Sequence, residues 1–389
     1  MQTDYINSIK EYLKEHRDEI LRDWETLVNM QGASREPEKV NQVICYLKSR
    51  LEEDGFTCKQ IPVGSNADLL VASEGADRPG KPIIFGGHLD TVFPEGSFPE
   101  NPFRLENDIC YGPGVVDMKG GVVAAFYIAK ILRELGCREH PLKFIFCGDE
   151  EIGHAGADTA ELMTEEAKGA LCAFNMETGR MDDHFTVGRK GGVDCHITIH
   201  GVGAHAGNAF YEGRNAIVEM AYKIPLLKDL SDPEKGVTVN AGVISGGTVS
   251  NAVPDCCKLE LDIRYKKVSD MYQVMDDIRD ICKRTFVEGT TTELTFLGAM
   301  PPMEESDGNY ALLEHLNKTA EKCGLEKHEP IYVGGCSDAS YFTLAGVPTV
   351  CSLGPKGSGS HTLEECGIVD TIFDRILLLS ASVMEINSL

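Results

Sequence analysis

Two hydrophobic patterns alternate in the first part of this chain. Apolar residues recur at helical spacing between Tyr5 and Glu53 and predict two amphipathic helices there. A further helix is predicted at 120–135. Short apolar runs, typical of strands that are buried on both faces, lie at 68–72, 82–86 and 142–147. The order strand, helix, strand predicts an α/β domain with a mostly parallel sheet.

The pattern changes at residues 193–200, where apolar side chains alternate with polar ones. This period of two is typical of a strand with one face in water. The pattern then predicts a helix, two strands, a helix and a strand, at 213–230, 237–244, 258–265, 269–286 and 293–297. That order predicts a ferredoxin-like α+β fold. We therefore expect an inserted domain at 187–298 between two parts of the α/β domain, 1–186 and 299–389.

The composition and charge of the chain argue against some classes of function. The chain has 389 residues, with 37 Lys and Arg against 61 Asp and Glu, and a formal net charge of −24. Such acidity argues against binding to nucleic acid or to an anionic membrane surface. No apolar stretch approaches the roughly 20 residues of a membrane-spanning helix. The N-terminal residues lack the features of a secretory signal, and the 14 cysteines are scattered, so we expect a cytoplasmic protein with reduced thiols.

Acidic and imidazole side chains follow several predicted strands, at the edge where open α/β sheets bind ligands. His88 and Asp90 are two residues apart in extended chain and point the same way, so Asp90 can accept the second ring N–H of a metal-bound His88. Asp117 lies between a glycine-rich loop and a helix. Taken singly, these residues also have ordinary readings as a surface hydrogen bond or a helix cap.

Three consecutive acids at 149–151 directly follow a predicted buried strand. Neighbouring carboxylates there repel one another without a cation, and one can bind metal while the next handles a proton. His154, just beyond, is expected to have a supporting or an exposed role. The candidate metal ligands are two imidazoles and three carboxylates, which are enough for two zinc-type ions if one carboxylate bridges them: His88, Asp117, Glu151, Glu177 and His361.

Six short motifs extend over nearly the whole chain, at 87–92, 112–121, 149–153, 203–207, 334–339 and 359–361. In this order they resemble the zinc aminoacylase/carboxypeptidase family, which includes glutamate carboxypeptidase, acetylornithine deacetylase and succinyl-diaminopimelate desuccinylase. Residues 174–178, 247–251 and 261–265 most resemble glutamate carboxypeptidase. This chain departs from that pattern at Met118, where the relative has an acid, and at Cys336, which leaves the substrate open.

The resemblance implies a role for each candidate ligand. His88 and Glu177 would hold one zinc ion, Glu151 and His361 the other, and Asp117 would bridge them. Cobalt or manganese could fill such sites as well.

The resemblance also implies roles for residues that are not ligands. Asp90 would orient His88, and Glu150 would be the general base that takes a proton from the attacking water and passes it to the leaving amine. His205 would reach across a dimer interface into the partner's site to stabilise the oxyanion, from an inserted domain that acts as lid and dimerisation domain. Three further residues would contact substrate: Asn251, Arg264 and Gly335.

We therefore expect an enzyme that hydrolyses an amide bond and releases an amino acid with a free carboxylate, as a dipeptidase or a glutamate carboxypeptidase-like exopeptidase. An N-acyl amino acid deacylase would keep the same catalytic residues. A non-catalytic binding protein on this fold would not need Glu150. A dinuclear phosphoesterase is less favoured, because no cluster of cations for a phosphate is found.

Overall fold

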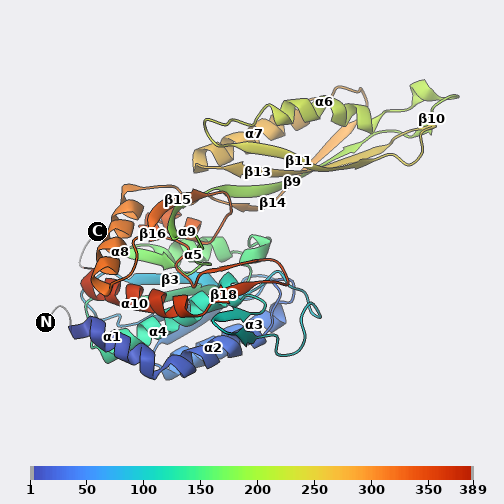
Figure 1. Ribbon diagram of the computed structural model, residues 1–389. Helices are drawn as coiled ribbons and strands as arrows, with labels where there is room; N and C mark the ends of the chain where they lie inside the picture. Colours follow the sequence, from blue (N-terminus) through green and yellow to red (C-terminus); the bar gives the residue numbers. More distant parts are fainter. Residues whose placement is uncertain (1–3, 387–389) are drawn as a thin grey trace. The chain divides into compact units, whose positions relative to one another are not determined.

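The computed structural model describes residues 4–386 and divides the chain into two compact units, each with its own hydrophobic core (Figure 1). The larger unit holds the residues up to Gly188, Glu305–Val333 and the residues from Ser337 onward. The smaller unit holds Arg189–Glu304 and Gly334–Cys336. The smaller unit therefore interrupts the larger one in sequence.

A six-stranded sheet forms the centre of the larger unit. In spatial order its strands are β1 (Thr57–Ile61), β2 (Leu69–Glu74), β6 (Leu142–Cys147), β3 (Ile83–His88), β7 (Cys172–Asn175) and β16 (Thr349–Val350). The last four run parallel to one another, whereas β2 is antiparallel to both of its neighbours. β3 is buried along its whole length, as a central strand covered on both faces must be. The predicted mostly parallel α/β sheet is confirmed.

Three helices, not two, precede this sheet, so the predicted count was wrong. They are α1 (Asp4–Glu15), α2 (Arg17–Asn29) and α3 (Pro37–Glu53). The break between the first two lies at His16, whose backbone leaves the helical region at φ −102° and ψ 11°. The apolar spacing continues across this break and therefore did not indicate it.

Helices cover both faces of the sheet (Figure 1). On one face lie α3 and α4 (Gly120–Glu134), with α10 (Asp370–Glu385) packed against α4. On the other face lie α5 (Thr159–Ala167) and α9 (Ala339–Leu344), which contact each other. Helix α8 (Asp307–Cys323) packs against α10 and the edge strand β16.

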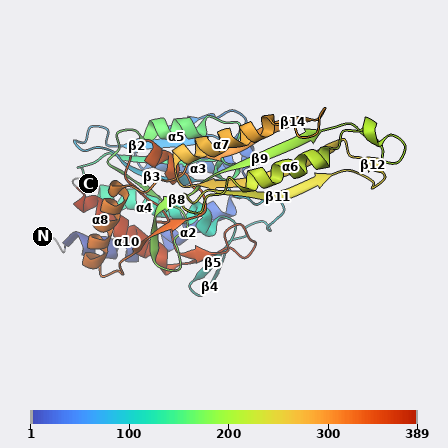
Figure 2. The same cartoon turned by 90° about the horizontal axis from the view of Figure 1, so that it is seen from above.

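The smaller unit has an antiparallel sheet with the spatial order β11 (Thr238–Gly246), β13 (Cys256–Tyr265), β9 (Gly191–His200) and β14 (Thr291–Met300). Helices α6 (Ala216–Lys228) and α7 (Val268–Lys283) lie on the same face of it (Figure 2). Along the chain the order is strand, helix, strand, strand, helix, strand, as predicted for a ferredoxin-like fold. The period-two pattern of β9 arises because alternate apolar side chains face these helices.

The remaining strands form small sheets. One has the order β17 (Gly357–Ser358), β18 (Cys366–Ile368), β5 (Ile109–Tyr111) and β4 (Arg104–Glu106). The other two are pairs, β8 (His184–Arg189) with β15 (Glu329–Val333) and β10 (Ala204–His205) with β12 (Ala252–Val253). Within residues 4–386, no helix is long and apolar enough to cross a membrane.

Candidate metal centre

All five candidate ligands lie in the larger unit, and three of them follow parallel strands of its central sheet. His88 is the last residue of β3, Glu151 comes four residues after β6, and Glu177 comes two residues after β7. Asp117 lies in the turn before α4, and His361 in the loop between β17 and β18. Because parallel strands end at the same edge, the first three residues meet there.

The side chains converge in two groups that share Asp117. The Nε2 atom of His88 lies 3.3 Å from Asp117 Oδ1 and 4.0 Å from Glu177 Oε1. The Nε2 atom of His361 lies 3.4 Å from Asp117 Oδ2 and 3.0 Å from Glu151 Oε2. Within each group, candidate ligand atoms lie within 4.8 Å of one another. Each oxygen of Asp117 therefore faces a different group, as a bridging carboxylate requires.

The carboxylates of the site favour positive charge on the groups between them. Burial alone would lower the pKa of His88, but hydrogen bonds to Asp117 and Asp90 raise it well above its usual value. Hydrogen bonds to Asp117 and Glu151 raise the pKa of His361 to about 10. Protons on both imidazoles thus act as counterions to the carboxylates, a task that divalent cations can take over. Imidazole and carboxylate donors in this number fit two zinc-type ions.

Asp90 contacts His88 and is fully buried. The Nδ1 atom of His88 is 3.1 Å from the backbone carbonyl of Asp90 and 3.4 Å from its Oδ1 atom. The Asp90 carboxylate also accepts hydrogen bonds from the backbone N–H groups of Glu150 and Glu151 and from the hydroxyl of Ser34. Asp90 therefore contacts His88 and also fixes the acidic loop, the segment that starts with the three acids at 149–151.

Glu150 lies beside Glu151, in the same loop. Burial foremost, with the negative charge of neighbouring acids, raises the pKa of the Glu150 carboxyl well above its usual value. Burial also raises the pKa of Glu151. A carboxyl group with a raised pKa suits proton transfer near neutral pH better than an ordinary glutamate.

Glu365 is a supporting residue that the sequence did not reveal. Its buried carboxylate accepts the backbone N–H groups of Gly114, Val116 and Asp117, at 2.9, 2.9 and 3.0 Å. It thereby fixes the turn that presents Asp117. The available signal was weak: a second acid four residues after His361.

Two other residues of the motifs have packing roles. Met118 is buried, and its Sδ atom accepts the backbone N–H of His88 at 3.3 Å. Gly121, the second residue of α4, lies so close to the residue that follows β7 that a Cβ atom there would be 1.8 Å from the carbonyl oxygen of Met176. This close approach explains why residue 121, which packs against the segment that carries Glu177, is a glycine.

The remaining candidates, His205, Asn251, Arg264 and Gly335, lie in the smaller unit. His205 is exposed in β10, and the backbone carbonyl of Asn251 accepts the N–H of Ala206 at 2.9 Å. The Nδ1 atom of His205 accepts two backbone N–H groups, at 3.1 Å each, so its proton lies on Nε2. The guanidinium of Arg264 pairs with Asp262 through Nε and Nη2, and its Nη1 atom donates to Cys336 Sγ at 3.1 Å.

Comparison with known proteins shows similarity over most of the chain. The family model described as peptidase family M20/M25/M40 matches residues 84–385. Carboxypeptidase G2 of Pseudomonas sp. (strain RS-16) is 28% identical over 382 residues, covering 95% of this chain and 89% of that protein. Succinyl-diaminopimelate desuccinylase of Ehrlichia ruminantium (strain Welgevonden) is 26% identical over 347 residues, covering 84% of this chain and 87% of that protein.

Solved structures share the fold. The M20 family metallo-carboxypeptidase Sso-CP2 of Sulfolobus solfataricus superposes with a TM-score of 0.78 at 18% identity, covering 94% of this chain and 98% of that one. The aminopeptidase PepT of Bacillus cereus ATCC 10987 gives a TM-score of 0.75 at 22% identity, covering 94% of this chain and 97% of that one.

Proposed function

Because the chain belongs to peptidase family M20/M25/M40 and is a metal-dependent hydrolase, we propose that it hydrolyses an amide bond with two zinc ions and releases an amino acid with a free carboxylate. The substrate is a dipeptide or a short peptide cut at its C-terminal residue, such as glutamate. The observation that carries the proposal is the division of the two Asp117 oxygens between His88 and His361.

His88 and Glu177 would hold one ion, Glu151 and His361 the other, and Asp117 both. Bound divalent cations polarise the scissile carbonyl and make water nucleophilic near neutral pH. Glu150 takes the proton of the attacking water at a carboxylate oxygen and delivers it to the leaving amine. Its position next to Glu151, in a loop held by Asp90, supports this role.

Residues of the smaller unit would bind the substrate. Arg264 would bind the free carboxylate of the substrate. That carboxylate would replace the Cys336 thiol as acceptor for the Nη1 N–H groups of Arg264. Asn251 and Gly335 would make further contacts. His205 would donate its Nε2–H to the oxygen that becomes negative as the carbonyl is attacked, and its exposed position and its tautomer support this role.

We also propose a homodimer formed through the smaller unit, in which His205 serves the site of the partner. Strand β11 is an edge strand and is exposed along most of its length. Val243 and Ile244 on it are each 54% exposed, and Ile217, Val218 and Tyr222 of the neighbouring α6 are exposed as well. An exposed apolar edge strand is a template for pairing with a second strand, here β11 of another copy.

A second candidate is a deacylase of N-acyl amino acids. The similarity to succinyl-diaminopimelate desuccinylase favours it specifically. This reaction would use the same ligands and Glu150, and only the pocket for the acyl group would differ.

The test combines metal analysis with a substrate panel of dipeptides, N-acetyl and N-succinyl amino acids, and N-aroylglutamates. We expect two metal equivalents per chain and hydrolysis within one of these classes. Glu150→Ala should keep both metals and lose about 10²–10⁴-fold in kcat. Glu161→Ala, at an exposed acid of α5, is the matched control and should retain activity. Binding of panel members without hydrolysis by the wild type would instead identify a binding protein.

A further inference from the structure

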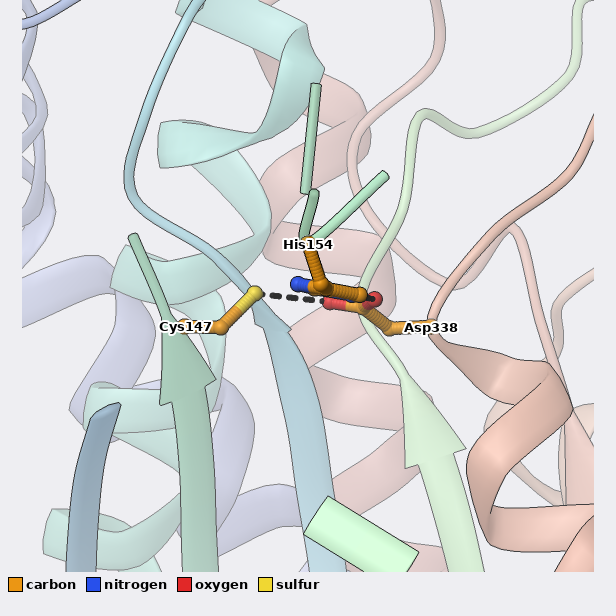
Figure 3. A group of neighbouring side chains, drawn as sticks. All are labelled: Cys147, His154 and Asp338. Carbon is orange, nitrogen blue, oxygen red and sulfur yellow. Dashed lines mark hydrogen bonds and ion pairs between the residues drawn. The ribbon is translucent and has the colours of Figure 1, made fainter. Parts of the chain in front are cut away.

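A second group of potential ligands lies outside the candidate metal centre: Cys147, His154 and Asp338 (Figure 3). Cys147 ends β6, His154 follows in the loop after that strand, and Asp338 immediately precedes α9. All three side chains are buried. Figure 3 shows the imidazole ring and the thiol both directed at the carboxylate of Asp338.

Both ring nitrogens of His154 face carboxylate oxygens. Nδ1 lies 2.8 Å from Asp149 Oδ1, and Nε2 lies 2.9 Å from Asp338 Oδ1. The second oxygen of Asp149 accepts hydrogen bonds from Asn66 and Thr159, and that of Asp338 accepts the thiol of Cys147. An ionised carboxylate has no proton to donate, so both ring nitrogens must donate and His154 is an imidazolium.

The spacing of these atoms favours hydrogen bonds over a bound cation. Ligand atoms around a tetrahedral zinc ion lie about 3.3–3.8 Å apart, given bonds of about 2.0–2.3 Å. Here the distance from Cys147 Sγ to Asp338 Oδ2 is 2.9 Å, and that from His154 Nε2 to Asp338 Oδ1 is also 2.9 Å. Among the described residues this group offers three ligands, whereas a structural zinc site uses four.

The backbone of His154 supports the same interpretation. Its φ is +54°, in the left-handed region that a residue with a Cβ atom adopts rarely. Such a conformation is strained and persists where the surroundings fix it. The two ion pairs of the side chain and the hydrogen bond from His154 N to Asp149 O, at 3.1 Å, fix it here.

With its ion pairs to Asp149 and Asp338, His154 forms a bridge at the loop 149–154, which contains Glu150 and Glu151. Asp149 and His154 are the two ends of the segment that contains Glu150 and Glu151, and Asp338 comes from a segment 184 residues away. We propose that His154 is a positioning residue, an imidazolium that joins Asp149 to Asp338 and thereby holds the Glu150 and Glu151 carboxylates in place. This inference rests on the proposed role of these two glutamates.

The groups around His154 keep it charged. Those in contact are Asp149 and Asp338, the thiol of Cys147 and the ring of Tyr341, whose centroid lies 5.3 Å from that of the imidazole. Burial alone would lower the pKa of His154, but the two aspartates raise it well above its usual value. Loss of the proton would set a nitrogen lone pair against a carboxylate, so we expect the bridge to persist through neutral and mildly alkaline pH.

The experiment compares two variants of the bridge with a matched control in the full-length, metal-loaded enzyme. In His154→Gln one donating group remains and the bridge is broken. In Asp338→Asn the new amide can donate to Nε2, so a neutral His154 can still join the two segments. The control is His140→Gln, because His140 is also buried with both ring nitrogens bonded to oxygens, those of Lys81 and Ile386.

We expect His154→Gln to lower kcat about 10–100-fold, with KM changed less than about threefold, and to weaken one of two Co²⁺ sites about tenfold. Asp338→Asn should keep kcat within about fivefold of the wild type, and His140→Gln should leave both quantities unchanged. Nitrogen-15 NMR of the wild type should show His154 protonated on both nitrogens at about pH 8. In Asp338→Asn the ring should be neutral there.

Three results would overturn the inference: an uncharged His154 at that pH, normal kcat and Co²⁺ affinity in His154→Gln, or a third bound metal that this variant loses. If His154→Gln does not fold, Asp338→Asn and the NMR measurement still decide the matter. An inactive wild type would refute the proposed function alone, because the Co²⁺ affinities and the protonation state do not depend on turnover.

Discussion

Replacing Asp90 by asparagine tests whether the candidate metal centre depends on the buried carboxylate that contacts His88 and the loop of Glu150 and Glu151. Its Oδ1 atom accepts the backbone N–H of Glu150 at 3.3 Å and lies 3.4 Å from His88 Nδ1. Its Oδ2 atom accepts the Ser34 hydroxyl at 2.6 Å and the backbone N–H of Glu151 at 3.1 Å. Each oxygen thus receives one backbone N–H, so an amide group in either orientation directs its NH₂ group at a backbone donor.

The size of the effect follows from these contacts. Hydrogen bonds to a charged group contribute about 1.5–3 kcal/mol each, and a buried N–H without an acceptor costs about 1–3 kcal/mol. The Ser34 hydroxyl can reverse and accept from the new amide, so we expect a net loss of about 2–4 kcal/mol. At about 2–4 °C per kcal/mol for a domain of this size class, the Tm should fall by about 4–16 °C. Metal affinity should fall about 10–100-fold, because His88 and the acidic loop lose their support.

Thermal unfolding, metal analysis after dialysis against a competing chelator, and kcat/KM on the substrate identified by the panel measure these effects. The control is Asp68→Asn, since Asp68 is partly exposed and its carboxylate accepts a single side-chain donor, Gln60, at 2.7 Å. We expect the control to behave like the wild type. If Asp90→Asn kept its metals and melted within about 1 °C of the wild type, the reasoning from the four donors would be wrong.

Two further predictions concern protons and assembly. In the metal-free protein, Asp117 and Glu151 raise the pKa of His361 from 6.5 to about 10, so the bound proton stabilises the native state fully below about pH 6.5 and this stabilisation is lost as the pH rises through about 10. The Tm should therefore fall more steeply between about pH 6.5 and about 10 in the wild type than in His361→Gln, and equal slopes in metal-free scans would contradict this. Val243→Arg on the exposed edge strand β11 should give monomers in sedimentation without lowering the Tm of the monomer. The control Leu297→Arg, on the opposite edge strand β14, should leave the dimer intact. If the wild type itself sediments as a monomer, the proposed interface is wrong.

The fold could be predicted from the sequence where burial sets a local period. The strand 142–147 was predicted with its observed bounds, because it is a short, mostly apolar run between Pro141 and Gly148. In β9 the alternation of buried and exposed residues revealed the second kind of sheet. The break at His16 was missed because a helix end without a capping side chain leaves the apolar spacing unchanged.

The candidate site was predicted in a different way, from residues that are adjacent in sequence to strand ends. His88, Glu151 and Glu177 belong to this class, and their convergence follows from the parallel sheet. His154 and Glu365 could not be assigned in this way, because their partners lie 184 and about 250 residues away in sequence. Only the tertiary fold brings a second carboxylate to His154, so its role as a bridge had no local signal.

Buried side chains support two of the segments that carry candidate ligands, the loop at 149–154 and the turn at Asp117. Asp90 binds two backbone N–H groups of the acidic loop, His154 joins the end of that loop to Asp338, and Glu365 binds three N–H groups of the turn at Asp117. These hydrogen bonds involve no metal. Cations would therefore bind to a site whose ligand loops are already ordered, unlike the small zinc domains in which metal binding drives folding. The energy of binding is then available for affinity, and the position of Glu150 relative to the substrate is fixed by the protein itself.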